Sequence, residues 1–453
     1  MAAWGGWALD GMDSFIYALV LVPSLGELLP RSGIAPTAAN VGYYGGLLFA
    51  LFLVGWGCSL VWGPLADRFG RVRTLMLSIL CYSLFTFLSA LATGVGQLAA
   101  FRLLAGVGIG GEWSMGGTFV AEEWPEDRRR MGAGLMHTGY YFGIFLAAVA
   151  NYLVGAKYGW RAMFALGGAP ALLVGFIRYG VHEPHRWQRI DDRRLTIDDC
   201  KTVATEPSAP GSAFAKMESA DDVPLGAFQS SIVNRQSTIS MRRAFFMIFS
   251  RPYLRRTILN SACLLVSIVG LWAGSVYVPA SVTDLAAQAG FTAPRAARLA
   301  SYATMLLAVG TILGCLVLPP LAERLGRRLT LGLYFLLMGV SIAVGFGWVF
   351  YLGAHALAWF MVCLFFLGVG GANFAMYTLW LPEQYPTRCR ASAFAFATSV
   401  GRFIGAGITF LVGAGVSRFH TIGTPVALTS LAFLLGLLLL PFCQETRGKP
   451  LPE

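Results

Sequence analysis

Long apolar runs recur along the whole chain and constrain its fold more than any other feature. Each run is about 20 residues long, the length that an α-helix needs to cross a hydrocarbon layer of ~30 Å. Only 13% of the residues are charged and 56% are hydrophobic, whereas about a quarter of the residues of a soluble domain are charged. We therefore expect an all-α membrane protein with twelve transmembrane helices, near 4–29, 41–65, 73–93, 97–121, 131–155, 162–181, 254–283, 299–322, 329–351, 355–381, 391–416 and 422–443.

The basic residues concentrate in alternate connections between these runs. The richer connections hold Arg68, Arg71, Arg73, Arg128, Arg129, Arg130, Arg324, Arg327, Arg328, Arg388 and Arg390. Because Lys and Arg are enriched in cytoplasmic loops, both termini are predicted to be cytoplasmic, in a plasma or inner membrane. This distribution explains the net charge of +11 without a nucleic-acid surface. The eight cysteines are scattered and form no CxxC, so no disulfide framework, metal site or cofactor is expected.

The polar segment 182–252 divides the chain into two halves. Charge pairs and turn formers in this segment predict a cytoplasmic linker between an N-terminal six-helix bundle, 1–181, and a C-terminal bundle, 253–443. The end of the linker, "MRRAFFMIFSRP", combines basic and aromatic residues and indicates a helix that lies on the membrane surface. Residues 444–453 are predicted to form a cytoplasmic tail.

Two turn motifs occur once in each half. "GPLADRFGR" at 63–71 returns as "PPLAERLGR" at 319–327, and "EEWPEDR" after the fourth run returns as "EQYPTRC" after the tenth. Such repetition predicts two pseudo-symmetric bundles. An acid and an arginine four residues apart normally form a weak surface pair. Their recurrence at equivalent turns favours a conformational role instead.

These motifs, together with the ending "QETRGKPLPE", resemble the major facilitator superfamily over the whole chain. Within it, "WALDGMDSF", "GIGGEW" and "HEPHRW" resemble the branch of proton-coupled metabolite symporters that includes sialate and lactate carriers. The resemblance implies a central cavity surrounded by spans 1, 4, 7 and 10, and turns that latch its cytoplasmic side. The latch residues that it indicates are Asp67, Arg71, Glu122, Arg128, Glu323, Arg327 and Glu383.

Ionisable residues inside the spans are the main functional candidates, because a charge in hydrocarbon costs several kcal/mol unless it faces protein or water. They are Asp10, Asp13, Arg102, Glu112, His137 and Arg402. Asp10 and Asp13 are three residues apart and therefore share one helix face. The repeat maps them onto Val266 and Val269, so the duplicated scaffold does not require them.

Some of these features can also be explained by structural roles alone. Asp10 is a candidate N-cap if its helix begins at Gly11, Arg102 a candidate structural arginine, and His137 a candidate packing residue. "GVGIGG" at 106–111 fits GxGxxG, but it lies in an apolar run with no preceding strand, which favours helix packing. GxxxxGK[ST], HExxH and GxSxG do not occur, so neither a nucleotide-driven pump nor an enzyme is expected.

The sequence thus predicts a monomeric carrier in the lipid bilayer that imports a small organic anion with protons, such as lactate or a sialic-acid-like sugar acid. Arg402 would anchor the anion, with Arg102, Asn373 and Tyr377 as further contacts. The proton would bind Asp13 and Glu112, assisted by Asp10 or His137. An aromatic-acid or other organic-ion symporter is the alternative, followed by a sugar carrier, an export antiporter and a nutrient receptor.

Overall fold

All regular elements in the described part of the chain are helices. The computed structural model describes residues 2–58, 62, 71–123, 129–172, 246–449 and 452. Ten of its helical segments are long and apolar enough to cross a membrane, and the shorter apolar helix Val95–Gly110 lies between two of them. In their described parts the expected runs therefore correspond to helices; the second, 41–65, is described as far as residue 58 and at 62, and the sixth, 162–181, as far as residue 172.

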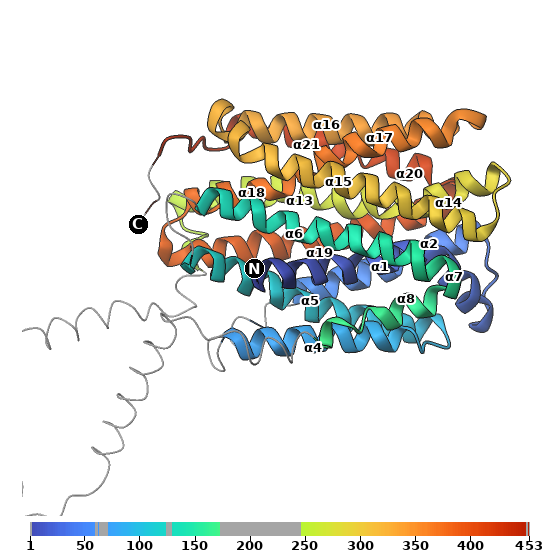
Figure 1. Cartoon of the computed structure of the whole chain (residues 1–453). Coiled ribbons are helices and arrows are strands. Elements are labelled where there is room, and N and C mark those ends of the chain that lie inside the picture. The colour runs from blue at the N-terminus through green and yellow to red at the C-terminus, as the bar shows by residue number, and fades with distance from the viewer. Residues whose placement is uncertain are drawn as a thin grey trace, which may run out of the picture.

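The first half places its helices side by side (Figure 1). They are α1 (Ala2–Arg31), α2 (Ala38–Gly57), α4 (Arg71–Ser89), α5 (Val95–Glu123), α6 (Arg129–Ala150), η2 (Asn151–Gly155), α7 (Ala156–Tyr158) and α8 (Trp160–Leu166). Because α1 already begins at Ala2, the interpretation of Asp10 as an N-cap is wrong. Asp10 lies inside the helix and needs another explanation.

The helices of the second half are more often interrupted. They are α13 (Arg251–Ile268), η3 (Val269–Gly274), η4 (Ser275–Tyr277), α14 (Val278–Gln288), α15 (Ala293–Leu325), α16 (Arg327–Gly347), η5 (Val349–Tyr351), η6 (Gly353–His355), α17 (Ala356–Gly371), η7 (Ala372–Phe374), α18 (Ala375–Trp380), η8 (Pro382–Gln384), α19 (Thr387–Phe419), α20 (Gly423–Leu428), α21 (Leu431–Leu439) and η9 (Leu440–Phe442). Most of the predicted linker, 182–252, and the start of its surface helix lie outside the described residues, which resume at residue 246. The domain boundaries remain predictions.

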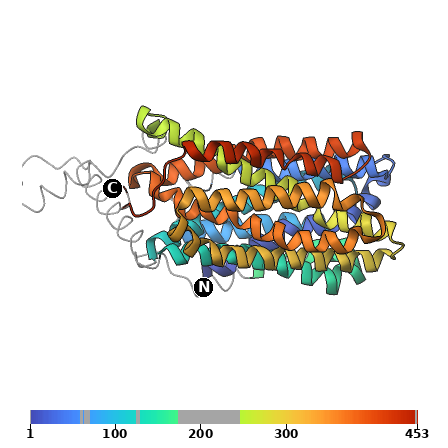
Figure 2. The same cartoon turned by 90° about the horizontal axis from the view of Figure 1, so that it is seen from above.

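The two halves meet along α2 with α19 and along α6 with α15, while α1 also contacts α14. Figures 1 and 2 show that both chain termini lie at the same end of the bundle, here called the terminus end. At the opposite end, a Cβ added at Gly46 of α2 would lie 2.7 Å from the Cα atom of Gly413 of α19. At the terminus end, a Cβ at Gly134 would lie 2.9 Å from Pro319 Cγ. The halves therefore touch on both sides of the centre.

Glycines let α1 and α6 approach each other at backbone distance. A Cβ added at Gly143 would collide with the carbonyl oxygen of Ala8, and one at Gly11 would collide with that of Tyr140. Small residues at such positions allow helices in a membrane to pack closely. This contact holds the acidic stretch of α1 against α6.

Adding a methyl group at Gly143 should loosen this contact. We expect Gly143→Ala to lower the free energy of unfolding by about 1–3 kcal/mol, the usual range for overpacking. The matched control is Gly407→Ala on α19, where nothing lies within 4 Å of an added Cβ. There alanine should be neutral or stabilising by up to ~1 kcal/mol, because it favours the helix. Thermal unfolding of both purified variants measures the difference, and equal unfolding temperatures would contradict the packing argument.

Candidate functional site

Asp13 of α1 and Arg102 of α5 form a buried pair of opposite charges within the first half. Their exposed fractions are 1% and 0%. Arg102 and Thr86 act electrostatically on Asp13, but within the described residues neither Asp13 oxygen has a donor at regular hydrogen-bonding distance. The three Arg102 nitrogens likewise have no hydrogen-bond acceptor there, and the guanidinium lies 4.4 Å from the Phe52 ring centroid. Within the described residues, the two side chains therefore interact through their charges and not through a direct hydrogen bond.

Asp10 and Arg402 form a second acid–arginine combination, and this one joins the two halves. Arg402 lies on α19 and is 4% exposed, and Asp10 on α1 is 0% exposed. Arg402 lies within electrostatic range of Tyr140 and of the Asp10 carboxylate. The Arg402 guanidinium lies 4.3 Å from the ring centroid of Trp56. The arginine that the sequence singled out for its missing partner on α19 thus faces an acid from the other half.

Aromatic side chains surround both arginines. Trp272 of the second half lies 5.5 Å from Trp56 and 5.9 Å from Phe52, measured between ring centroids. On the other side of α1, Trp7 lies 5.7 Å from Tyr140 and 5.8 Å from His137. The centre therefore offers flat apolar surfaces beside two cations.

The remaining predicted substrate and proton residues lie in different surroundings. His137 is 3% exposed and sits between the rings of Trp7 and Phe374. Asn373 donates to Gly370 O at 2.8 Å, and its Oδ1 has no partner among the described residues. Tyr377 is already hydrogen-bonded through its hydroxyl to Ser267 at 3.0 Å. Glu112 lies on α5, but its side chain is outside the description.

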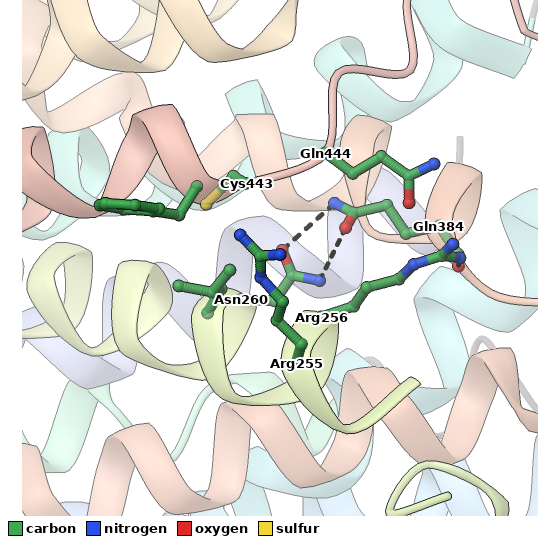
Figure 3. Close-up of a pocket in the computed structure, with 8 residues that line it drawn as sticks. Arg255, Arg256, Asn260, Gln384, Cys443 and Gln444 are labelled. Atoms are coloured by element: carbon green, nitrogen blue, oxygen red, sulfur yellow. Dashed lines mark hydrogen bonds between the residues drawn. The ribbon is translucent and has the colours of Figure 1, made fainter. Parts of the chain in front are cut away.

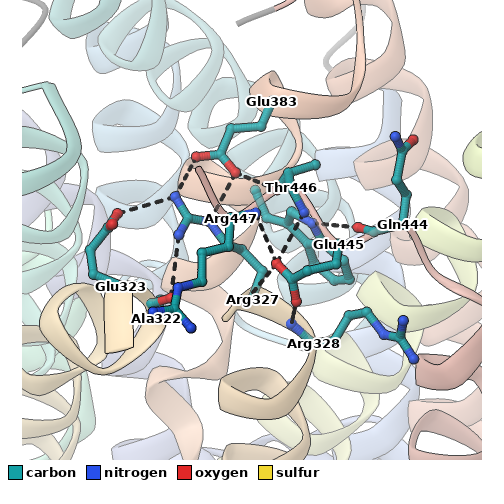
Figure 4. A network of polar contacts seen from close by, with 10 residues as sticks. Ala322, Glu323, Arg327, Arg328, Glu383, Gln444, Glu445, Thr446 and Arg447 are labelled. Atoms are coloured by element: carbon teal, nitrogen blue, oxygen red, sulfur yellow. Dashed lines mark hydrogen bonds and ion pairs between the residues drawn. The ribbon is translucent and has the colours of Figure 1, made fainter. Parts of the chain in front are cut away.

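Three predicted latch residues of the second half meet at the terminus end (Figure 4). Arg327 is 1% exposed and donates from Nε and Nη2 to the two oxygens of Glu383, at 3.0 and 2.7 Å. Its Nη2 also donates to Glu323 at 3.1 Å. Of the first-half counterparts, Asp67 and Arg128 lie outside the described residues, as do the side chains of Arg71 and Glu122.

The tail is docked onto this network instead of extending away from the bundle. The Glu445 carboxylate accepts from the backbone N–H groups of Arg327 and Arg328 at 3.0 and 3.1 Å, and Thr446 donates to Glu383. Burial by itself would raise the pKa of Glu445, but the backbone donors outweigh it and leave that pKa below its usual value. A charged carboxylate thus caps the first turn of α16, where the helix dipole favours an anion.

Comparison with known proteins identifies the family. The model of the Major Facilitator Superfamily matches residues 4–410. The chain belongs to the major facilitator superfamily. It is accordingly a multi-pass membrane transporter and not an enzyme. The superfamily fold, with twelve transmembrane helices in two bundles, confirms the predicted fold class.

Two relatives and one solved structure align with nearly the whole length of this chain. The "Probable 4-methylmuconolactone transporter" of Cupriavidus pinatubonensis is 30% identical, over 99% of this chain and 90% of its own. The "4-hydroxybenzoate transporter PcaK" of Pseudomonas aeruginosa is 27% identical, over 94% of this chain and 89% of its own. A crystal structure of a D-xylose-proton symporter has a TM-score of 0.70 at 18% identity, covering 99% of this chain and 98% of that one. That last likeness shows the fold alone.

The sequence did not single out Trp56, Tyr140 or Glu445 as parts of these sites. Aromatic residues make up 13% of the chain and occur in most apolar runs, so nothing in the sequence distinguishes the rings beside the arginines. Glu445 lies in the quoted ending of the chain, but its contact with the start of α16 spans more than a hundred residues.

Glu383 and Glu323 both contact Arg327, so substituting each in turn shows which glutamate is its dominant partner. Glu383→Gln should lower the free energy of unfolding by about 3–5 kcal/mol, because it leaves the buried Arg327 without its main counter-charge. Glu323 is 43% exposed, so Glu323→Gln should cost less than ~1 kcal/mol. Thermal and denaturant unfolding of the two variants compare them directly. Equal losses would show that Glu383 is not the dominant partner.

Proposed function

We propose that this transporter couples the import of a small organic carboxylate to the import of protons. The observation that carries the proposal is that Asp10 and Arg402, two buried residues from different halves, lie within electrostatic range of each other. In alternating access, the halves rock against each other around a central site. The attraction between two opposite charges across that site weakens when the acid binds a proton or the arginine binds an anion.

Arg402 is the proposed anchor for the substrate carboxylate. A guanidinium group is planar, keeps its charge, and can hold a carboxylate through two parallel hydrogen bonds. The cation–π contact with the Trp56 ring holds the guanidinium group at this position. Arg102, Asn373 and Tyr377 remain proposed further contacts, and the unsatisfied Oδ1 of Asn373 supports its place among them.

Asp10 and Asp13 are the proposed proton carriers on α1, with Glu112 and His137 as further candidates. Once an anion binds Arg402, Asp10 loses its share of the positive charge, and a buried unpaired carboxylate is costly. Protonation of Asp10 removes that cost, so the anion and the proton bind more favourably together than separately. Asp13 stands in the same relation to Arg102. The fully neutralised centre would then switch between its two orientations most readily.

A ring-bearing carboxylate fits this centre better than lactate does. Trp56, Trp272 and Phe52 pack together beside the two arginines, so a ring that enters when the centre opens would meet aromatic partners, and aromatic pairs contribute about 0.5–1.5 kcal/mol beyond their buried area. Lactate has no ring to use them. The names of the two relatives support this choice, since 4-methylmuconolactone and 4-hydroxybenzoate are both ring-bearing acids or lactones. We therefore favour the aromatic-acid type of symporter over a carrier of lactate or a sialic-acid-like sugar acid.

The proposed orientation places the terminus end in the cytoplasm of a plasma or inner membrane, with a monomer as the working unit. The excess of arginine in the connections at this end supports it. The latch formed by Glu383, Arg327 and the docked tail would then close the cytoplasmic side when the centre opens outward.

Asp13→Asn should separate coupling from binding. In proteoliposomes with an inward proton gradient, we expect the variant to lose uphill accumulation of labelled 4-hydroxybenzoate. It should still exchange internal for external substrate, because exchange needs no net proton release. Asp284→Asn, at the opposite end of the bundle, is the control and should behave as wild type. Uphill accumulation at the wild-type level in Asp13→Asn would assign the coupling role elsewhere, with Asp10 and then Glu112 as the next candidates.

A further inference from the structure

A small cavity lies at the terminus end of the second half, apart from the central site (Figure 3). Its volume is about 190 Å³, and it lies between the start of α13, the η8 turn and the start of the tail. The residues that line it are Arg255, Arg256, Leu259, Asn260, Gln384, Phe442, Cys443 and Gln444. The proposed transport mechanism uses none of them.

Positive charge dominates this cavity. Two of the lining residues are arginines and none is acidic. Arg256 donates from Nη1 to the backbone oxygen of Gln384 at 3.1 Å, which holds its guanidinium at the cavity wall. The charges of Arg255 and of the nearby Arg328 both act on the sulfur of Cys443. An anion in the cavity would meet two cations, one of them held in place by Gln384, and no acidic residue among those that line the wall.

Neutral polar groups complete the wall. The side-chain amides of Asn260 and Gln384 are 1% and 2% exposed and donate to each other, at 3.0 and 3.1 Å. Gln444 Oε1 is buried and has no hydrogen-bond partner among the described residues. A buried acceptor without a donor costs about 1–3 kcal/mol. A ligand that carries a hydroxyl group beside its negative charge would supply the missing donor.

Large exposed apolar side chains lie among or next to the lining residues, on α13 and at the end of η9. Phe442 and Ile258 are each 59% exposed, and Leu254 is 39% exposed. All three lie at the ends of membrane-spanning segments, where the hydrocarbon layer meets the head groups. An acyl chain can lie against them while a head group enters the cavity.

We propose that this cavity binds the head group of an anionic phospholipid. The phosphate group lies between Arg255 and Arg256, and a head-group hydroxyl donates to Gln444 Oε1. The acyl chains pack against Phe442 and Ile258. Basic pockets between transmembrane helices bind acidic lipid head groups in this way. Gln384 directly follows the latch residue Glu383, and Gln444 directly precedes Glu445. An occupied cavity therefore stiffens the walls that it shares with the latch.

Lipid binding to the purified full-length transporter tests the proposal. The protein in a mild non-ionic detergent is titrated with phosphatidylglycerol, and the thermal unfolding temperature is recorded. We expect a saturable rise for wild type, and none with phosphatidylcholine. Arg255→Gln and Arg256→Gln should each weaken the apparent affinity about fivefold, the loss expected for one basic residue beside an anionic surface. Gln444→Leu should also weaken it, through loss of the hydroxyl contact.

Arg418→Gln is the matched control, because Arg418 is an exposed arginine at the other end of the bundle. It should keep the wild-type response to phosphatidylglycerol. A full response in the double variant Arg255→Gln with Arg256→Gln would overturn the proposal. An equal, variant-sensitive response to inorganic phosphate alone would also overturn it, since the site would then bind free anions instead of lipid. These outcomes are independent of substrate transport.

Discussion

Burial of ionised side chains inside an apolar bundle is the constraint on which the rest of this structure depends. Moving a charge from water into a protein interior costs several kcal/mol even after the surroundings relax. An opposite charge offsets this cost only when the two groups are well positioned and otherwise hydrogen-bonded. Here α1 brings two carboxylates into the centre, and each faces an arginine from another helix. One arginine belongs to the same half as α1, and the other belongs to the opposite half.

This division gives the two acid–arginine combinations different consequences. Asp13 and Arg102 both move with the first half, so their interaction survives a rocking motion between the halves. Asp10 and Arg402 belong to different halves, so the same motion changes their separation. In the proposed mechanism, proton or anion binding at the second combination would therefore bias the relative position of the halves, as coupled transport requires. At the terminus end, the buried Arg327 is also paired with an acid from another element, Glu383 of η8.

The fold was predictable from the sequence because its main determinant is local. A run of about 20 apolar residues predicts a spanning helix without any knowledge of its neighbours. The latch partners Glu323, Arg327 and Glu383 were also predictable, since a repeated motif marks them in both halves. The partner of Arg402 was not, because a contact between α19 and α1 leaves no pattern in either segment. The docking of Glu445 and the rings around the arginines depend on tertiary packing in the same way.

Carboxylate binding to Arg402 variants tests the role of this residue most directly. The measurement is the rise in thermal unfolding temperature of purified protein on titration with 4-hydroxybenzoate or related ring carboxylates. Wild type should respond saturably, and Arg402→Ala should not. Arg402→Lys should recover only part of the response, because an ammonium group cannot form the planar two-donor contact. A full response in Arg402→Ala would remove this residue from the substrate site and contradict the proposed mechanism of coupling.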